Sequence, residues 1–306
     1  MTRILRLGTR GSPLALAQSQ AFADSLMRAR PGLKLELRTI TTSGDRIQNR
    51  FLSEVGGKGL FVKEIEDALL AGEVDLAVHS LKDMPAVLPE GLEIGCYPER
   101  RDPHDVLIAR AGGDWRGLPE GARVGTTSLR RRLQLKALRP DLRFEMLRGN
   151  IDTRLRRLRE GAFDAIVLAK AGMQRLGLDL EGAVELPILP APGQGTLAIE
   201  IRGADASLRQ DLSALHHAPT EAASLAERRV MRELGGSCNL PLGVYGEMRG
   251  DRMRLSAFLS DLEGERHIEA ACEGAAADPL GLADQLLARI WERGGREILD
   301  AIAKRT

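Results

Sequence analysis

The chain repeats one short pattern, and this internal repeat constrains the fold more than any other feature. Gly8-Thr9-Arg-Gly-Ser12 corresponds to Gly125-Thr126-Thr-Ser128, and Gly72-Glu-Val-Asp75-Leu-Ala-Val78 corresponds to Gly161-Ala-Phe-Asp164-Ala-Ile-Val167. Around both copies, apolar strand-like runs alternate with helix-like runs. This alternation is typical of mainly parallel sheets with helices on both faces, which bind ligands at the carboxyl ends of their strands. We therefore expect two α/β domains of one plan with an interdomain cleft.

Helix-start signals place the elements within each copy. Ser12 before Pro13, Ser128 and Asn150 are typical N-cap residues. The expected strands are 4–8, 33–41 and 74–78 in the first copy, and 123–125, 142–147 and 163–168 in the second. The expected helices run from Ser12 to about Met27 and over 60–70, 129–138 and 151–159.

The first copy carries an insertion. The two pairs of corresponding segments are 117 and 89 positions apart, so the first copy is longer between them. Much of the surplus falls in 42–59, which is polar and contains glycines. Long loops in compact α/β units are usually lids or binding loops, so this stretch predicts a mobile flap over the cleft.

The end of the chain follows another plan. After a strand at 196–201 that returns to the first domain, we expect a helix at 220–234, three strands, and one helix over 279–303. This predicts a small α+β domain. The expected domains are 1–99 with 197–216, then 100–196, then 217–306.

Composition excludes several classes of protein. No run of about 18 apolar residues occurs, so no membrane association is expected. The first residues lack a signal-peptide core, and the cysteines (Cys96, Cys238 and Cys272) are too scattered for a disulfide framework, which fits the cytoplasm. The five histidines form no metal-binding motif, so no metal is expected.

Arginines cluster in the second copy. Residues 123–159 contain eleven Arg and one Lys against three acidic residues, although the whole chain has a net charge of +1. Arg130, Arg131 and Arg154 lie in the first turns of predicted helices, where cations are disfavoured unless an anion binds. With Arg10 and Arg148 near strand ends, they predict a carboxylate or phosphate site. Alternatively, single arginines of this set only extend into solvent.

Two further residues are candidates for chemistry. Asp83 follows the strand at 74–78, where α/β enzymes place reactive groups, although an Asp in a turn before Pro85 is usually a capping residue. Cys238 follows the permissive turn Gly235-Gly-Ser237, which would expose its thiol for attachment. Taken alone, a lone cysteine is more often small, buried and inert.

Seven motifs together resemble the porphobilinogen deaminase family over essentially the whole chain. They are Thr9-Arg-Gly-Ser-Pro-Leu-Ala-Leu16, Gly57-Lys-Gly-Leu-Phe-Val-Lys-Glu64, His79-Ser-Leu-Lys-Asp83, Gly125-Thr-Thr-Ser-Leu-Arg-Arg131, Arg148-Gly-Asn-Ile-Asp-Thr-Arg154, Pro192-Gly-Gln-Gly195 and the Cys238 turn. The resemblance implies two periplasmic-binding-protein-like domains and a third domain. It also implies a monomeric transferase of tetrapyrrole (haem) biosynthesis that joins four porphobilinogen molecules into hydroxymethylbilane and releases four ammonia.

The resemblance also assigns roles. It implies a dipyrromethane primer bound by a thioether to Cys238, with Asp83 as the catalytic carboxylate. Implied cofactor contacts are Ser80, Lys82, Thr127, Ser128, Arg130, Arg131 and Arg154. Implied substrate contacts are Arg10, Ser12, Arg148, Arg154 and Arg175, and the implied active-site loop carries Lys58 and Phe61.

Two other interpretations remain open at this stage. A two-lobed solute-binding module would use the arginines for an anionic ligand and leave Cys238 unmodified. A nucleic-acid binder would use the arginines of 123–159, but aromatic residues make up only 3% of the chain and Phe144 is the only one in that stretch. We therefore expect no nucleic-acid partner.

Overall fold

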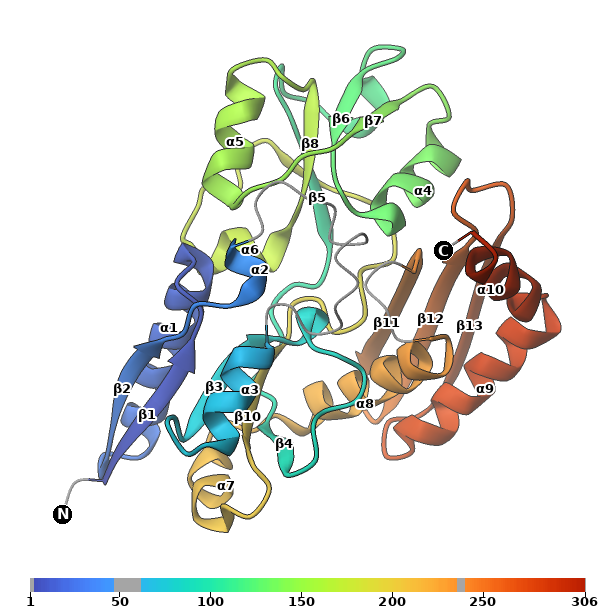
Figure 1. Cartoon of the computed structure of the whole chain (residues 1–306). Coiled ribbons are helices and arrows are strands. Elements are labelled where there is room, and N and C mark those ends of the chain that lie inside the picture. Colours follow the sequence, from blue (N-terminus) through green and yellow to red (C-terminus); the bar gives the residue numbers. More distant parts are fainter. Residues whose placement is uncertain (1–2, 47–61, 236–239, 306) are drawn as a thin grey trace. The chain divides into compact units, whose positions relative to one another are not determined.

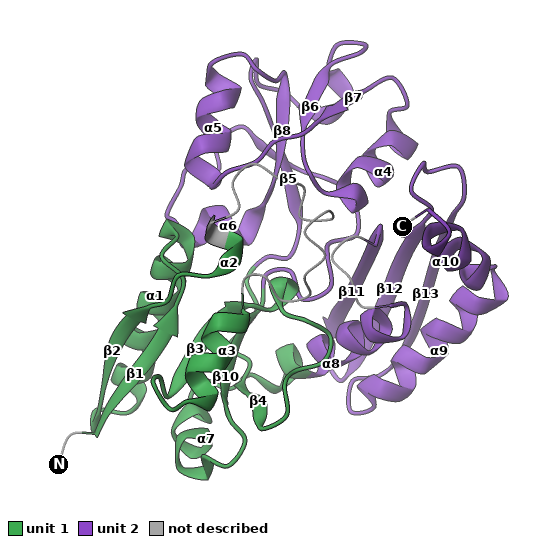
Figure 2. Ribbon diagram, in the orientation of Figure 1, with its two compact units in different colours: residues 1–101, 196–221 green, residues 102–195, 222–306 purple. Residues whose placement is uncertain are grey.

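The computed structural model describes residues 3–46, 62–235 and 240–305 (Figure 1). The chain forms two compact units: residues 1–101 with 196–221, and residues 102–195 with 222–306 (Figure 2). The further division of the second unit into a middle and a C-terminal domain stays a prediction, as does the cleft.

Unit 1 is built on a five-stranded sheet of order β2-β1-β3-β10-β4. Its strands are β1 (Arg3–Thr9), β2 (Leu33–Thr39), β3 (Leu76–Ser80), β4 (Leu92–Cys96) and β10 (Leu197–Arg202). Its helices are α1 (Pro13–Ala29), α2 (Ser43–Arg46), α3 (Lys63–Leu70) and α7 (Ala206–Leu212). β1 runs parallel to β2 and β3, whereas β10 is antiparallel to β3 and β4. The expected strand that returns to the first domain is therefore confirmed.

Opposite faces of this sheet carry different side chains. Leu5 and Leu7 of β1 pack with Phe22 and Leu26 of α1, all almost fully buried. On the other face, the helix α3 packs against β1, β3, β4 and β10. The alternation of side chains along each strand thus produces two apolar layers around one sheet.

Unit 2 contains a second five-stranded sheet with the same plan, of order β7-β6-β8-β5-β9. Its strands are β5 (Asp105–Ala109), β6 (Arg123–Gly125), β7 (Arg143–Glu145), β8 (Ala165–Ala169) and β9 (Ala183–Glu185). Its helices are α4 (Leu129–Leu138), α5 (Ile151–Arg159) and α6 (Lys170–Arg175). β6 is parallel to β7 and β8, and β5 is antiparallel to β8, as β10 is to β3. The structure therefore confirms the predicted repeat.

The remainder of unit 2 contains a three-stranded antiparallel sheet. Its elements are α8 (Ala218–Glu233), β11 (Leu242–Arg249), β12 (Arg252–Ser260), β13 (His267–Ala275), α9 (Pro279–Glu292) and α10 (Gly295–Ala303). The expected single helix over 279–303 is wrong. Gly294 has φ +89°, a conformation that favours glycine and ends one helix before the next begins.

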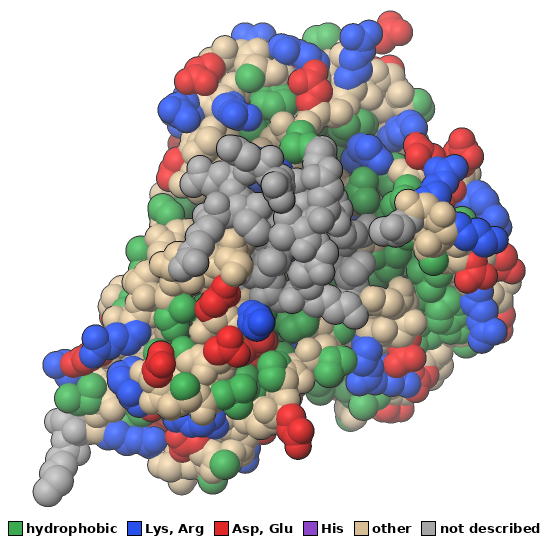
Figure 3. Space-filling model, in the orientation of Figure 1, with side chains coloured by type: hydrophobic (Ala, Val, Ile, Leu, Met, Phe, Trp, Pro, Cys, Tyr) green, Lys and Arg blue, Asp and Glu red, His purple; other side chains and the backbone are tan. Residues whose placement is uncertain are grey.

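The fold class is therefore confirmed as α/β, with two mainly parallel sheets and a C-terminal α+β part. On the face drawn in Figure 3, Lys and Arg side chains are interspersed with Asp and Glu over both units. None of the described helices combines the length and the hydropathy that crossing a membrane requires.

Candidate functional site

In unit 1, the predicted site residues gather at one edge of the sheet. Arg10 and Ser12 follow β1, and Ser80, Lys82 and Asp83 lie at or after the end of β3. Because these two strands are adjacent and parallel, their carboxyl ends meet at this edge. The Nε2 of Gln18, from α1, donates to the Ser80 Oγ at 3.2 Å and joins the two segments.

Asp83 lies in a short 3-10 turn, Leu81–Asp83, that apolar side chains anchor. Leu81 and Met84 are 1% and 2% exposed, and the Leu81 N–H donates to the Thr196 carbonyl at 3.0 Å. Asp83 itself is exposed. A fixed turn thus presents one carboxylate to solvent at the carboxyl end of a strand.

Ser12 has a structural role that the sequence predicted. Its hydroxyl accepts a hydrogen bond from the Ala15 N–H at 3.3 Å and caps α1, which begins at Pro13. This contact neither requires nor excludes the substrate contact implied for the same side chain.

In unit 2, three parallel strands bring the second set of residues to one edge of the sheet. Thr127 and Ser128 follow β6, Arg148 follows β7, and α6, which follows β8, ends at Arg175. Ser128 caps α4 by accepting from the Arg131 N–H at 3.4 Å, and Asn150 caps α5 by accepting from the Thr153 N–H at 2.9 Å. Both predicted caps are confirmed. The first turn of α4 contains no acidic residue, whereas the first turn of α5 contains Asp152.

A buried carboxylate, Asp105, holds Arg130 and Arg131. Asp105 Oδ2 lies 2.7 Å from Arg130 Nη1, and Asp105 Oδ1 lies 2.7 Å from Arg131 Nη2. The side chain of Asp105 is fully buried, and those of the two arginines are 5% and 8% exposed. Carbonyl groups fix the guanidinium orientations further, since Arg130 donates to Leu189 and Arg131 to Val167.

This cluster keeps an excess of positive charge. Burial alone would raise the pKa of Asp105, but the charges of Arg130 and Arg131 outweigh it and hold that pKa below its usual range. Burial lowers the pKa of Arg130, which the charge of Asp105 only partly offsets. Two buried guanidinium groups thus share one carboxylate, and this arrangement favours a further anion.

Arg154 extends the cationic region from α5. Burial and the nearby charge of Arg131 lower the pKa of Arg154 to about 10. Its Nε donates to the Gly149 carbonyl at 2.8 Å, which orients the guanidinium group without supplying a negative charge. A bound carboxylate would relieve both the burial cost and the repulsion from Arg131.

The remaining predicted residues divide into described and undescribed ones. Arg148 is partly buried, and Arg175 Nη2 donates to the Gly195 carbonyl at 2.6 Å. Lys58, Phe61 and Cys238 lie outside the described residues.

Sequence reasoning missed Asp105 and Gln194. The Nε2 of Gln194 donates to Asp105 Oδ1 at 2.8 Å, and its side chain is 1% exposed. Asp105 reaches the site because β5 is antiparallel to β8, so its first residue pairs with Ala169 at the last position of β8. The only available signal was an aspartate directly before the apolar run Val106-Leu-Ile-Ala109.

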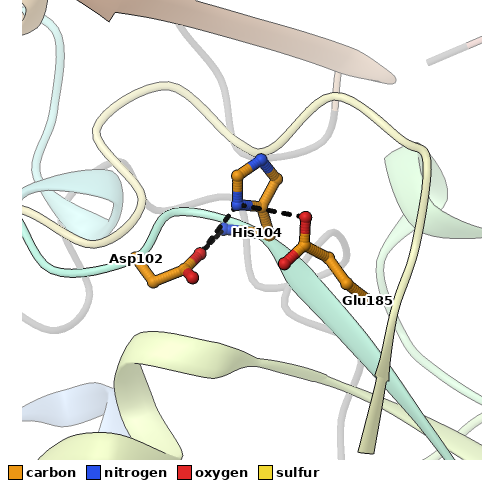
Figure 4. A group of neighbouring side chains, drawn as sticks. All are labelled: Asp102, His104 and Glu185. Atoms are coloured by element: carbon orange, nitrogen blue, oxygen red, sulfur yellow. Dashed lines mark hydrogen bonds and ion pairs between the residues drawn. The ribbon is translucent and has the colours of Figure 1, made fainter.

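Asp102, His104 and Glu185 form the one cluster of potential metal ligands among the described residues (Figure 4). Both carboxylates point toward the imidazole ring, and His104 Nδ1 lies 2.7 Å from Asp102 Oδ1. However, Lys170 Nζ lies 2.5 Å from Asp102 Oδ2 and 3.1 Å from Glu185 Oε2. An ammonium group therefore already occupies the position of a cation, and this cluster is an ion-pair network.

Comparisons with known proteins agree on one family. Residues 5–210 match the family described as porphobilinogen deaminase, dipyromethane cofactor binding domain, and residues 222–291 match its C-terminal domain. The porphobilinogen deaminase of Syntrophobacter fumaroxidans is 47% identical over 303 residues, which cover 98% of each chain. That of Geobacter sulfurreducens is 42% identical over 304 residues, which cover 98% of this chain and 95% of the relative.

A solved structure titled "BenM effector binding domain with its effector benzoate" is 14% identical, with a TM-score of 0.42. The likeness covers 77% of this chain and 95% of that chain. It adds nothing to the fold described above.

Proposed function

The chain belongs to the porphobilinogen deaminase family, and from this premise we propose how its residues divide the work of that enzyme. The enzyme joins four porphobilinogen molecules into hydroxymethylbilane, with release of four ammonia, on a covalently bound dipyrromethane. When bound, the dipyrromethane would supply the free pyrrole position to which the first new ring is joined, and each later ring would be joined to the ring added before it.

The observation that supports the division is the charge balance of the arginine cluster. Arg130, Arg131 and Arg154 supply three guanidinium groups. Within the described part of the chain, Asp105 is the only carboxylate that forms an ion pair with any of them. Porphobilinogen and the dipyrromethane carry carboxylate side chains. We assign Arg130, Arg131 and Arg154 to the binding of these carboxylates, together with Ser80, Lys82, Thr127 and Ser128 for the cofactor, and Arg10, Ser12, Arg148 and Arg175 for the substrate.

Asp83 is assigned the catalytic role. Its exposed carboxylate, fixed by Leu81 and Met84, can accept hydrogen bonds from the pyrrole N–H of the substrate. When ammonia leaves, the substrate becomes cationic, and a carboxylate held nearby stabilises that charge more than the neutral ground state. Cys238 is assigned the thioether to the cofactor, and Lys58 and Phe61 are assigned to a loop that covers the substrate.

Several arginines of 123–159 are held by contacts within the protein. Arg139 donates to both carboxylate oxygens of Asp141, and Arg132 donates to the Leu262 carbonyl. Arg130 and Arg131 are also held internally, so these four charges are not free to bind a phosphate backbone. Arg143, Arg156, Arg157 and Arg159 are exposed. We therefore propose a monomeric cytoplasmic enzyme whose partner is porphobilinogen, with no nucleic-acid or membrane partner.

Intact mass of the purified protein tests the assignment. The wild type should carry the mass of two linked pyrrole units, and brief exposure to porphobilinogen should add a ladder of single-ring increments. Cys238→Ser should show neither the adduct nor the ladder. Asp83→Ala should retain the adduct and lose turnover by at least about a hundredfold. A wild type that is active at its unmodified mass would refute the role of Cys238.

Two matched variants of α5 test the arginine assignment. Arg154→Leu should accumulate cofactor-free protein or stop the ladder early, because it removes one of the anion-binding groups. Arg156→Leu, an exposed position on the same helix, is the control and should behave like the wild type. Equal adduct and ladder in both variants would contradict the role of Arg154.

A further inference from the structure

Besides the Asp105 cluster of unit 2, the protein contains a buried group of titratable side chains in unit 1. The proposed reaction assigns no role to this group. Glu66 of α3, His79 of β3 and Glu200 of β10 are 6%, 5% and 0% exposed. His79 Nε2 lies 3.0 Å from Glu200 Oε2. The Oε1 atoms of Glu66 and Glu200 have no hydrogen-bond partner among the described residues.

The strand register explains how the three side chains come together. In the β3–β10 pair, His79 is opposite Ala198 and Ala77 is opposite Glu200, so His79 and Glu200 lie on the same face of the sheet. This is the face that α3 covers, since Ile65, Ala68 and Leu69 pack with Ala77 in one cluster. Glu66 therefore lies on the helix that covers the face of the sheet carrying His79 and Glu200.

Two carboxylates and one imidazole in an apolar layer cannot all take their usual charge states. Two negative charges beside at most one positive charge would leave a net buried charge, which is strongly unfavourable. Burial and the negative charge of Glu200 raise the pKa of Glu66 to about 7, and the charge of His79 only partly opposes them. At neutral pH the carboxyl group of Glu66 is therefore protonated to a larger extent than it would be in water.

Among the described residues of α3 and of the neighbouring strands, the other charged side chains are exposed or have partners of their own, so none of them neutralises Glu66, His79 and Glu200. Asp75 pairs with Arg6 at 2.9 Å and with Arg202 at 3.4 Å, and Glu93 pairs with Arg209 at 2.6 Å. On α3, Lys63 and Asp67 are exposed, the charge of Asp67 adds to the raised pKa of Glu66, and Glu64 accepts from the Ser43 N–H at 2.7 Å.

The same helix fixes the turn of Asp83. Val62, the N-cap residue of α3, packs in a buried cluster with Leu81, Met84 and Ala198. Val62 and Glu66 are four residues apart, so they lie on one face of the helix. The position of α3 on the sheet thus determines both the environment of Glu66 and the packing of the two residues that anchor Asp83.

We propose that Glu66 shares a proton with Glu200 and His79, and that this proton keeps α3 seated so that the Leu81–Met84 turn holds Asp83 in place. Loss of the proton leaves like charges facing each other beneath α3 and loosens the helix. Glu66 is then a positioning residue that makes turnover depend on pH. This inference rests on the role proposed for Asp83.

Hydrogen exchange tests the shared proton without reference to catalysis. Amide exchange of peptides covering 62–84 is compared between the wild type and Glu66→Gln, both as holoenzyme, at matched pH values so that intrinsic exchange rates cancel. The ratio of the protection factors, Glu66→Gln to wild type, should rise by up to about tenfold per pH unit between pH 5 and 7. In the wild type, opening of this region releases the proton held by Glu66, so opening becomes easier as the pH rises, whereas the amide has no proton to release. Asp67→Asn, at the exposed neighbour whose charge is the smallest of the causes acting on the pKa of Glu66, should show a much weaker trend.

A pH profile of kcat tests the positioning role. The ratio of kcat values, Glu66→Gln to wild type, should rise between pH 6 and 8.5, because the amide cannot lose the proton.

Should Glu66→Gln fail to fold, Glu200→Gln serves instead and should shift the exchange transition to lower pH, since it removes the negative neighbour. A pH-independent exchange ratio overturns the shared proton. A changing exchange ratio with a flat kcat ratio overturns the link to Asp83, and an active Asp83→Ala would instead overturn the proposed function.

Discussion

At the scale of single residues, Asp105 is the group on which the arginine cluster depends. Its substitution by Asn would leave Arg130 and Arg131 buried without a negative partner. Removing one partner of a buried ion pair typically costs about 3–5 kcal/mol. We expect Asp105→Asn to lower the free energy of unfolding of unit 2 by this amount when the cofactor is absent, and by less when it is present, measured by urea unfolding of both forms.

A matched control shows whether the loss of stability comes from burial of the ion pair or from removal of a carboxylate charge as such. Glu160→Gln removes a carboxylate whose partner, Arg156 Nε, is 4.0 Å away at the surface, and it should change stability far less. If the two variants were equally stable, or if the cofactor did not reduce the loss in Asp105→Asn, the cluster would not be the anion site.

Acid unfolding should reveal the same carboxylate. The pKa of Asp105 is lowered in the folded protein, so its contribution is complete above the unfolded pKa of about 4 and is lost as the pH falls below it. The wild type should therefore lose stability between about pH 4 and pH 2 more steeply than Asp105→Asn, as followed by circular dichroism. Parallel acid curves would contradict a depressed pKa.

At the scale of elements, the start of α5 serves both helix capping and anion binding. Asn150 caps α5, and the arginines assigned to substrate and cofactor, Arg148 and Arg154, flank it. Asn150→Asp would cap equally well and favour the helix dipole by about 0.3–1 kcal/mol. Its charge would also compete with substrate carboxylates.

We therefore expect Asn150→Asp to keep or raise the melting temperature while increasing KM for porphobilinogen several-fold. Asn150→Ser, a neutral cap, is the control and should leave KM near the wild-type value. An unchanged KM in Asn150→Asp would place the substrate carboxylates elsewhere.

Local sequence patterns predicted most helices and strands, but they did not predict the contacts between segments that are distant in the sequence. Ser128 and Asn150 correctly predicted the starts of α4 and α5, because an N-cap residue acts on the first turn of its own helix. The expected single C-terminal helix was wrong although Gly294-Gly295 offered a breaking signal. The positions of Asp105 and of the His79–Glu200 pair depend on antiparallel strands that join distant segments, and a single sequence does not specify the register of such strands.

At the scale of the whole molecule, the two units have separate cores. Every buried apolar cluster of the described residues lies within one unit: three clusters in unit 1, around α1, α3 and the Asp83 turn, and three in unit 2. Cooperative unfolding requires shared burial, so a protein of two such units need not unfold in one step.

Tryptophan fluorescence can follow one unit alone, because Trp115 and Trp291, the two tryptophans of the chain, both belong to unit 2. Circular dichroism reports helices and strands of both units. In urea, Asp105→Asn should move the fluorescence midpoint to lower concentration and split the circular-dichroism curve into two steps, the second of which belongs to unit 1. If fluorescence and circular dichroism moved together as a single transition, the units would unfold as one body, because loss of an ion pair in unit 2 would then destabilise the core beneath α1 as well.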